Sequence, residues 1–168
     1  MDTQKKSSDD QALPQRKTNR LSGFDYSTAN VYFVTICVQN RQNLFWSVGA
    51  TCGRPDETPP LSASGRVVDA EIHKIAGFFK QIKVEKYCNM PDHIHMIVTI
   101  GDCRGDSGGR PQVAPTLSRI IQQFKGSITK RIGESIWQKS FYDHIIRDDE
   151  DYGNIWQYID MNPSRGKG

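Results

Sequence analysis

The order in which strand-like and helix-like hydrophobic patterns follow one another limits this chain to few folds. Runs of β-branched and aromatic residues predict short strands, and apolar residues that recur every three to four positions predict helices between them. The expected elements, in order, are strand 31–38, a helical pattern over 67–79, strands 82–88 and 93–100, helix 116–132, an extended piece with Trp137 and 141–146, and helix 149–161. This order predicts an α+β sandwich, in which helices cover a central antiparallel sheet.

Local signals set the expected ends of two helices. Gly133 directly follows the pattern of helix 116–132 and is expected to stop it. Asp148 is expected to cap the start of the last helix, with Asp151 three residues on, and Pro163 is expected to end that helix. These boundaries matter because the last helix carries two candidate site residues.

The composition fits a single domain. The chain has 168 residues, 36% of them hydrophobic, and no apolar run near the ~20 residues that span a bilayer. Residues 1–20 are polar and lack the apolar core of a signal peptide, so they are expected to form a disordered arm before a domain at 21–168. Residues 49–60 and 101–115 are rich in glycine and proline and are expected to be loops. We therefore expect a cytoplasmic protein with no membrane segment.

The cysteines leave metal binding to other side chains. They are Cys37, Cys52, Cys88 and Cys103, and no two of them are spaced as a CxxC pair. A disulfide framework is not expected in a cytoplasmic chain of this size. We therefore expect free thiols.

Two histidines separated by one residue lie at the start of strand 93–100. Alternate residues of a strand point to the same face, so His93 and His95 are expected to project side by side, while the apolar residues between and after them face a core. Two neutral imidazoles placed in this way can bind one divalent metal ion. A half-buried polar pair without a metal is the alternative that the spacing leaves open.

The last helix offers a tyrosine and an amide on one face. Tyr158 and Asn162 are four residues apart, which separates them by one helical turn. They could supply a nucleophilic oxygen and a third, oxygen-type metal ligand, and a metal ion would polarise a phosphate for in-line attack. A core or interface tyrosine and a helix-end asparagine are the alternatives. Tyr142 and Tyr152 have no amide four residues on, which favours Tyr158 as the nucleophile.

Basic side chains cluster on helix 116–132, with no acidic residue among them. They are Arg119, Lys125, Lys130 and Arg131. Such a cluster can bind a phosphate backbone, and His144 is a further candidate for contact with DNA. A solvated surface is the other interpretation that charge alone allows.

Four segments together carry a resemblance to a known family. They are 32–37 with 39–41, 90–95, 120–125, and 136–139 through 144–147 to 158–163. The chain resembles the single-tyrosine HUH transposases, and within them the REP-associated tyrosine transposases, over roughly residues 24–163. HUH stands for His–hydrophobe–His, which residues 93–95 satisfy.

This resemblance implies a ferredoxin-like (RRM-like) fold and a metal-dependent transposase. His93 and His95 would be metal ligands for Mg²⁺ or Mn²⁺, Tyr158 the nucleophile, and Asn162 the third ligand, where relatives have glutamine or asparagine. The implied reaction cleaves single-stranded DNA next to a hairpin and gives a 5′-phosphotyrosine and a free 3′-OH. Asp92 departs from the family, which often has asparagine there; it could orient a ligand or merely turn the chain.

Three functions remain open at this stage. The first is the DNA-nicking and rejoining enzyme just described, acting on hairpin-containing single-stranded DNA as a monomer or a homodimer. The second is a domesticated DNA-binding protein that keeps the fold and does not cleave. The third is a metal-dependent hydrolase that uses the histidine pair without the tyrosine.

Overall fold

The computed structural model of the chain describes residues 30–47, 60–101 and 115–165. The expected N-terminal arm 1–20 and nearly all of the two expected glycine- and proline-rich loops lie outside the described residues. Cys52 and Cys103 also lie outside them, whereas Cys37 and Cys88 are buried in the thiol form, as expected.

The elements follow the expected β-α-β-β-α-β-α order, with one added 3₁₀ turn. They are β1 (Asn30–Cys37), η1 (Gln39–Arg41), α1 (Ala63–Phe78), β2 (Ile82–Asn89), β3 (His93–Ile100), α2 (Leu117–Ile132), β4 (Tyr142–Ile146) and α3 (Asp149–Arg165). Each helix and strand overlaps the segment predicted for it, and β3 has the predicted bounds. None of the described helices is long and apolar enough to cross a membrane.

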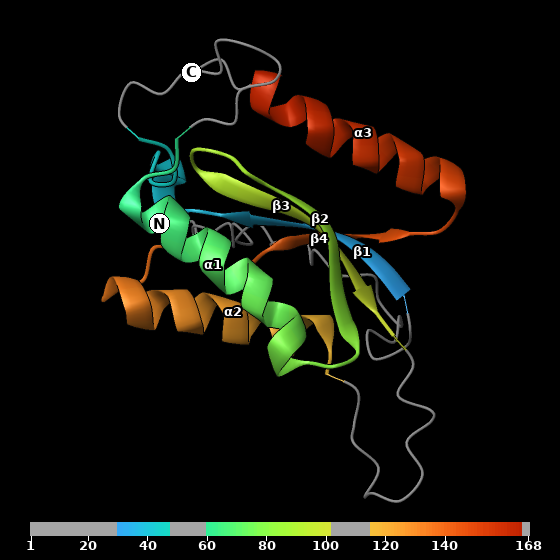
Figure 1. Cartoon of the computed structure of the whole chain (residues 1–168), viewed down its shortest axis with the longest axis horizontal. Coiled ribbons are helices and arrows are strands. Elements are labelled where there is room, and N and C mark those ends of the chain that lie inside the picture. Colours follow the sequence, from blue (N-terminus) through green and yellow to red (C-terminus); the bar gives the residue numbers. More distant parts are fainter. Residues whose placement is uncertain (1–29, 48–59, 102–114, 166–168) are drawn as a thin grey trace, which may run out of the picture.

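The strands form one antiparallel sheet in the order β2-β3-β1-β4. Helices α1 and α2 lie together on one face of this sheet, and α3 crosses the opposite face (Figure 1). The first six helices and strands thus have ferredoxin-like connectivity, and α3 is an addition that covers the second face. This confirms the expected α+β sandwich with a central antiparallel sheet.

Alternation along the two central strands separates the core from the site. On β1 and β3, the side chains that face α1 and α2 are fully buried: Tyr32, Val34, Ile36, Ile94, Met96 and Val98. Fully burying one such aliphatic side chain contributes about 1.5–3 kcal/mol. The side chains on the opposite face of the same strands include Thr35 and His95, which are direct cross-strand partners. The histidines therefore face α3.

Two of the three predicted helix boundaries are confirmed. Gly133 ends α2 in a left-handed conformation (φ 94°), and the Asp151 backbone N–H donates to Asp148 Oδ1 at 2.8 Å at the start of α3. The expected end at Pro163 is wrong, because α3 continues to Arg165. Proline removes one backbone N–H from a helix, but the φ that it fixes, about −65°, is a helical value, so a proline does not by itself turn the backbone out of the helix.

Candidate active site

The histidine pair lies on β3, on the sheet face that α3 covers. The Nε2 atoms of His93 and His95 are 3.0 Å apart, and their rings meet edge to face. The strand alternation that predicted a shared face is therefore matched by the geometry. His95 is buried and His93 is partly exposed, so the pair can be approached from the His93 side.

The outer nitrogen of each imidazole has a partner of its own. His93 Nδ1 lies 2.5 Å from Asp92 Oδ1, and His95 Nδ1 lies 2.9 Å from Thr35 Oγ1. Asp92 also accepts a hydrogen bond from Arg41 at 3.2 Å. Partners of this kind fix ring orientation in metal sites and leave the other nitrogen free to ligate. Asp92 therefore orients His93 and does more than turn the chain.

Electrostatics keep His95 and Asp92 in the ionisation states that metal binding needs. Burial, followed by electrostatic interaction with His93 and Arg41, lowers the pKa of His95 to about 3, so its imidazole is neutral at physiological pH. Burial opposes ionisation of Asp92, but hydrogen bonds and charge from His93 and Arg41 lower its pKa. A neutral imidazole backed by a nearby carboxylate is a suitable ligand for a divalent cation.

The spacing of the two Nε2 atoms fits a shared cation. At 3.0 Å, the two nitrogens are close enough for both to contact one ion, and this distance is also that of a single hydrogen bond between the rings. Within the described part of the chain, no three His, Cys, Asp or Glu side chains gather as a metal-binding group. A third ligand from this part of the chain would therefore be of another type.

Tyr158 reaches the pair from α3. Its hydroxyl lies 3.4 Å from His95 Nε2, and its ring meets the rings of His95 and Phe33 edge to face. Phe33, on β1, also stacks on His95 with centroids 5.2 Å apart. Tyr158 is 41% exposed, so a substrate can reach its hydroxyl while its ring is held. The structure thus brings together two strand histidines and a helix tyrosine that are more than sixty residues apart.

Asn162 lies one turn beyond Tyr158 and is buried. Its Nδ2 atom has no hydrogen-bond partner among the described residues. Buried amides are normally hydrogen-bonded, and leaving one unpaired costs about 1–3 kcal/mol. The unpaired atom is a donor, whereas an amide binds a cation through Oδ1, so Asn162 as a metal ligand stays a prediction.

Three of the five residues predicted to contact DNA are engaged within the fold. Lys125 Nζ donates to the backbone carbonyls of Gln138 and Ser140 at 2.9 and 2.7 Å. Arg131 forms an ion pair with Glu71, and His144 Nε2 lies 2.8 Å from Asp151 Oδ2. Arg119 and Lys130 are exposed. All four basic residues of α2 are on the helix that covers the face opposite the histidine pair, and their contact with DNA stays a prediction.

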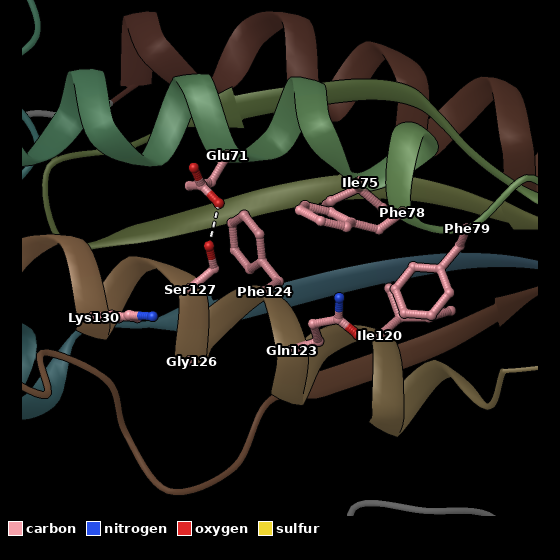
Figure 2. Close-up of a pocket in the computed structure, with 10 residues that line it drawn as sticks. All are labelled: Glu71, Ile75, Phe78, Phe79, Ile120, Gln123, Phe124, Gly126, Ser127 and Lys130. Carbon is pink, nitrogen blue, oxygen red and sulfur yellow. Dashed lines mark hydrogen bonds between the residues drawn. The ribbon is translucent and has the colours of Figure 1, made fainter.

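A separate cavity of about 210 Å³ lies between α1 and α2, on the face of the sheet away from the histidines. Its lining is mostly apolar and includes Ile75, Phe78 and Phe124 (Figure 2). At one side, the Glu71 carboxylate accepts a hydrogen bond from Ser127 (Figure 2). This carboxylate serves the contact between the two helices.

Sequence reasoning did not find Thr35, Arg41 or Phe33. The alternation of β1 places Phe33 and Thr35 on one face, and that signal was present in the sequence. Their proximity to His95 follows from strand register, which pairs Thr35 with His95 across sixty residues. Register of this range is set by the completed fold.

Together, the fold and the site define an α+β protein in which a strand-borne histidine pair meets a helix-borne tyrosine over one face of an antiparallel sheet.

Comparisons with known proteins agree with this description. No protein-family model matches the chain. A Haemophilus influenzae protein described only as uncharacterized is 29% identical over 167 residues, covering 90% of this chain and 89% of that protein. A second protein of that organism, named "putative REP-associated tyrosine transposase", is 25% identical over 150 residues, covering 83% of this chain and 73% of the relative.

Among solved structures, a REP-associated tyrosine transposase bound to a REP hairpin matches with a TM-score of 0.57 and 21% identity, covering 81% of this chain and 67% of that one. This match shows a shared fold. Together with the sequence relative of the same name, it agrees with the resemblance that the motifs carry: the chain is similar in sequence to a protein named as a REP-associated tyrosine transposase and shares the fold of another.

Proposed function

We propose that this protein is a metal-dependent single-stranded DNA endonuclease and strand transferase that acts next to hairpin sequences. The observation that carries the proposal is the 3.4 Å approach of the Tyr158 hydroxyl to His95 Nε2, beside His93. The choice of substrate is supported by a relative named as a REP-associated tyrosine transposase and by a fold shared with a protein bound to a REP hairpin.

His93 and His95 would hold the divalent ion, Mg²⁺ or Mn²⁺, and Asn162 is the proposed third ligand. The bound ion would polarise the scissile phosphate as a Lewis acid. Asp92 and Thr35 fix the two imidazoles through their Nδ1 atoms. The ligand nitrogens are thereby oriented before DNA arrives.

Tyr158 would supply the nucleophile. Its phenol oxygen attacks the phosphorus and forms a tyrosine–phosphate ester, while the bond from phosphorus to the 3′ oxygen breaks. The proton lost by the phenol is balanced by the proton that the departing 3′ oxygen takes up from water. The reverse attack by a 3′-OH reseals a strand, and because the ester keeps the phosphodiester's energy, resealing needs no ATP. Phe33 and His95 hold the tyrosine ring during this cycle.

The test is a comparison of wild type with Tyr158→Phe on end-labelled single strands that carry a hairpin, in Mg²⁺ or Mn²⁺. Wild type is expected to give a protease-sensitive covalent adduct on the 5′-phosphate fragment and a 3′-OH fragment that a polymerase extends. Tyr158→Phe is expected to give neither. Tyr152→Phe, which removes a hydroxyl from the same helix, is the matched control and is expected to retain the reaction.

Other outcomes of this assay favour the alternative functions. Cleavage that survives in Tyr158→Phe would remove the tyrosine from the reaction and favour a metal-dependent hydrolase. Hairpin binding by wild type without any cleavage in either metal would favour a DNA-binding protein that has kept the fold.

A further inference from the structure

A lysine of the edge strand β2 contacts α3 on the flank away from the candidate nucleophile. Lys86 Nζ lies 4.0 Å from the centroid of the Trp156 ring and forms an ion pair with Asp160. The Lys86 side chain is only 16% exposed, whereas Lys83, three residues earlier on the strand, is 71% exposed. Lys86 is therefore enclosed by the helix that it binds.

The two partners of Lys86 fix the rotation of α3 about its own axis. Trp156 and Asp160 are four residues apart and lie on one flank of the helix. Tyr158 is two residues from each, which places it about 200° around the axis. Ile159 lies between these flanks and is buried against the sheet. A contact that holds one flank against β2 therefore sets where the other flank lies above β3 and β1.

A second contact holds the start of α3 at the other edge of the sheet. His144, on β4, hydrogen-bonds Asp151, and Asp148 caps the helix. Strands β4 and β2 are the two edges of the four-stranded sheet, and α3 runs across the face between them (Figure 1). With its N-terminus fixed by His144, the remaining freedom of α3 is rotation and sideways movement near Tyr158. Lys86 restrains that freedom.

We propose that Lys86 is a positioning residue for Tyr158, acting through Trp156 and Asp160. The proposal rests on the function proposed above for the tyrosine. A tyrosine hydroxyl extends on the order of 8 Å from a helix axis, so a rotation of about 10° moves it by about 1.4 Å. A misplacement of about 1 Å can lower a reaction rate about 100-fold. Small rotations of α3 are therefore sufficient to uncouple the hydroxyl from the histidine pair.

The kinetic test measures adduct formation on the full chain at saturating hairpin DNA, together with the Kd for that DNA. Lys86→Ala is expected to slow adduct formation about 10- to 100-fold and to change Kd by less than about 3-fold. Lys86→Arg keeps the charge and the contact with the indole ring, and is expected to recover most of the rate. Lys83→Ala removes an exposed ion pair with Glu85 from the same strand and is expected to behave as wild type.

An unchanged rate of adduct formation at saturation in Lys86→Ala would overturn the proposal. If Kd were weakened while the rate stayed normal, Lys86 would be assigned to phosphate binding. If Lys86→Ala does not fold, Trp156→Leu takes its place, because it removes the ring that the ammonium contacts and retains an apolar side chain.

Hydrogen–deuterium exchange of the metal-free, DNA-free protein separates failure of this proposal from failure of the proposed function. Lys86→Ala is expected to speed amide exchange in the 155–162 segment of α3 and to leave β1 and β3 unchanged, and Lys86→Arg is expected to restore protection. If wild type forms no adduct, the proposed function fails, and exchange alone decides whether Lys86 holds α3. Unchanged exchange in Lys86→Ala would overturn that role.

Discussion

Replacing Glu71 with glutamine is expected to weaken the contact between α1 and α2 and to remove part of the acid sensitivity of folding. The Glu71 carboxylate is buried and accepts hydrogen bonds from Lys74 at 2.8 Å, from Arg131 at 2.6 Å and from Ser127. Burial opposes its ionisation, but these three donors lower the pKa of Glu71 to about 2. The carboxylate is therefore more stable as an anion in the folded chain than in the unfolded chain.

The pKa difference gives the magnitude. A fall from the ordinary value of 4.5 to about 2 corresponds to about 3 kcal/mol of folding free energy at pH 7. The Lys74 and Arg131 side chains are about half exposed, so solvent screens part of this interaction and about 2 kcal/mol is expected. Because the folded pKa lies below the unfolded one, this stabilisation is present above pH 4.5 and is lost as the pH falls toward 2.

Urea unfolding of wild type and Glu71→Gln at pH 7 and pH 3 measures this contribution. The variant is expected to be about 2 kcal/mol less stable at pH 7, with a smaller deficit, about 1 kcal/mol, at pH 3. Glu134→Gln, at an exposed position just after α2, is the matched control and is expected to follow wild type at both values. If the difference in unfolding free energy between wild type and Glu71→Gln were the same at both pH values, the assignment of the carboxylate as a buried anion would be refuted.

Two further predictions concern packing and the metal site. Gly65→Ala would place a Cβ 2.1 Å from the carbonyl oxygen of Phe45 and is expected to lower the free energy of unfolding in urea by about 2 kcal/mol. Gly126→Ala, with open space around it, is expected to raise the free energy of unfolding by up to about 1 kcal/mol. Equal effects of the two substitutions would contradict the close approach of Gly65 to Phe45. Asp92→Ala removes the partner of His93 and is expected to weaken Mn²⁺ binding about 10- to 100-fold in calorimetric titration. Asp92→Asn is expected to weaken this binding less. An unchanged Mn²⁺ affinity in Asp92→Ala would show that the contact between Asp92 and His93 does not orient the ligand.

The strand that carries the histidines could be predicted because its pattern is local. Polar and apolar residues alternate from His93 to Met96, apolar residues dominate from there to Ile100, and the strand begins at His93 and ends at Ile100. The shared helical face of Tyr158 and Asn162 is equally local, since it depends only on a spacing of four residues. Periodicity therefore identified which side chains point in one direction within each element.

The contacts that join these elements could not be predicted from periodicity. Thr35 meets His95 because β1 and β3 pair in one register, and a shift of one residue would turn Thr35 to the other face. Lys86 meets α3 because β2 is an edge strand beside β3 and α3 crosses toward it. Both facts depend on the order of strands in the sheet and on the face that α3 takes, and these follow from packing of the whole domain.

The placement of α2 bears on how DNA can be held. Its exposed basic residues Arg119 and Lys130 lie on a helix that covers one face of the sheet, while Tyr158 and the histidine pair lie on the other face (Figure 1). Layers packed on a sheet are separated by about 10 Å, so the two faces cannot contact the same nucleotide. In the proposed reaction, charge on α2 would therefore act only on a part of the DNA remote from the scissile phosphate. Among the described residues, the groups that would position that phosphate in the proposed reaction lie on the α3 face, where Phe33, His95 and Tyr158 are in mutual contact.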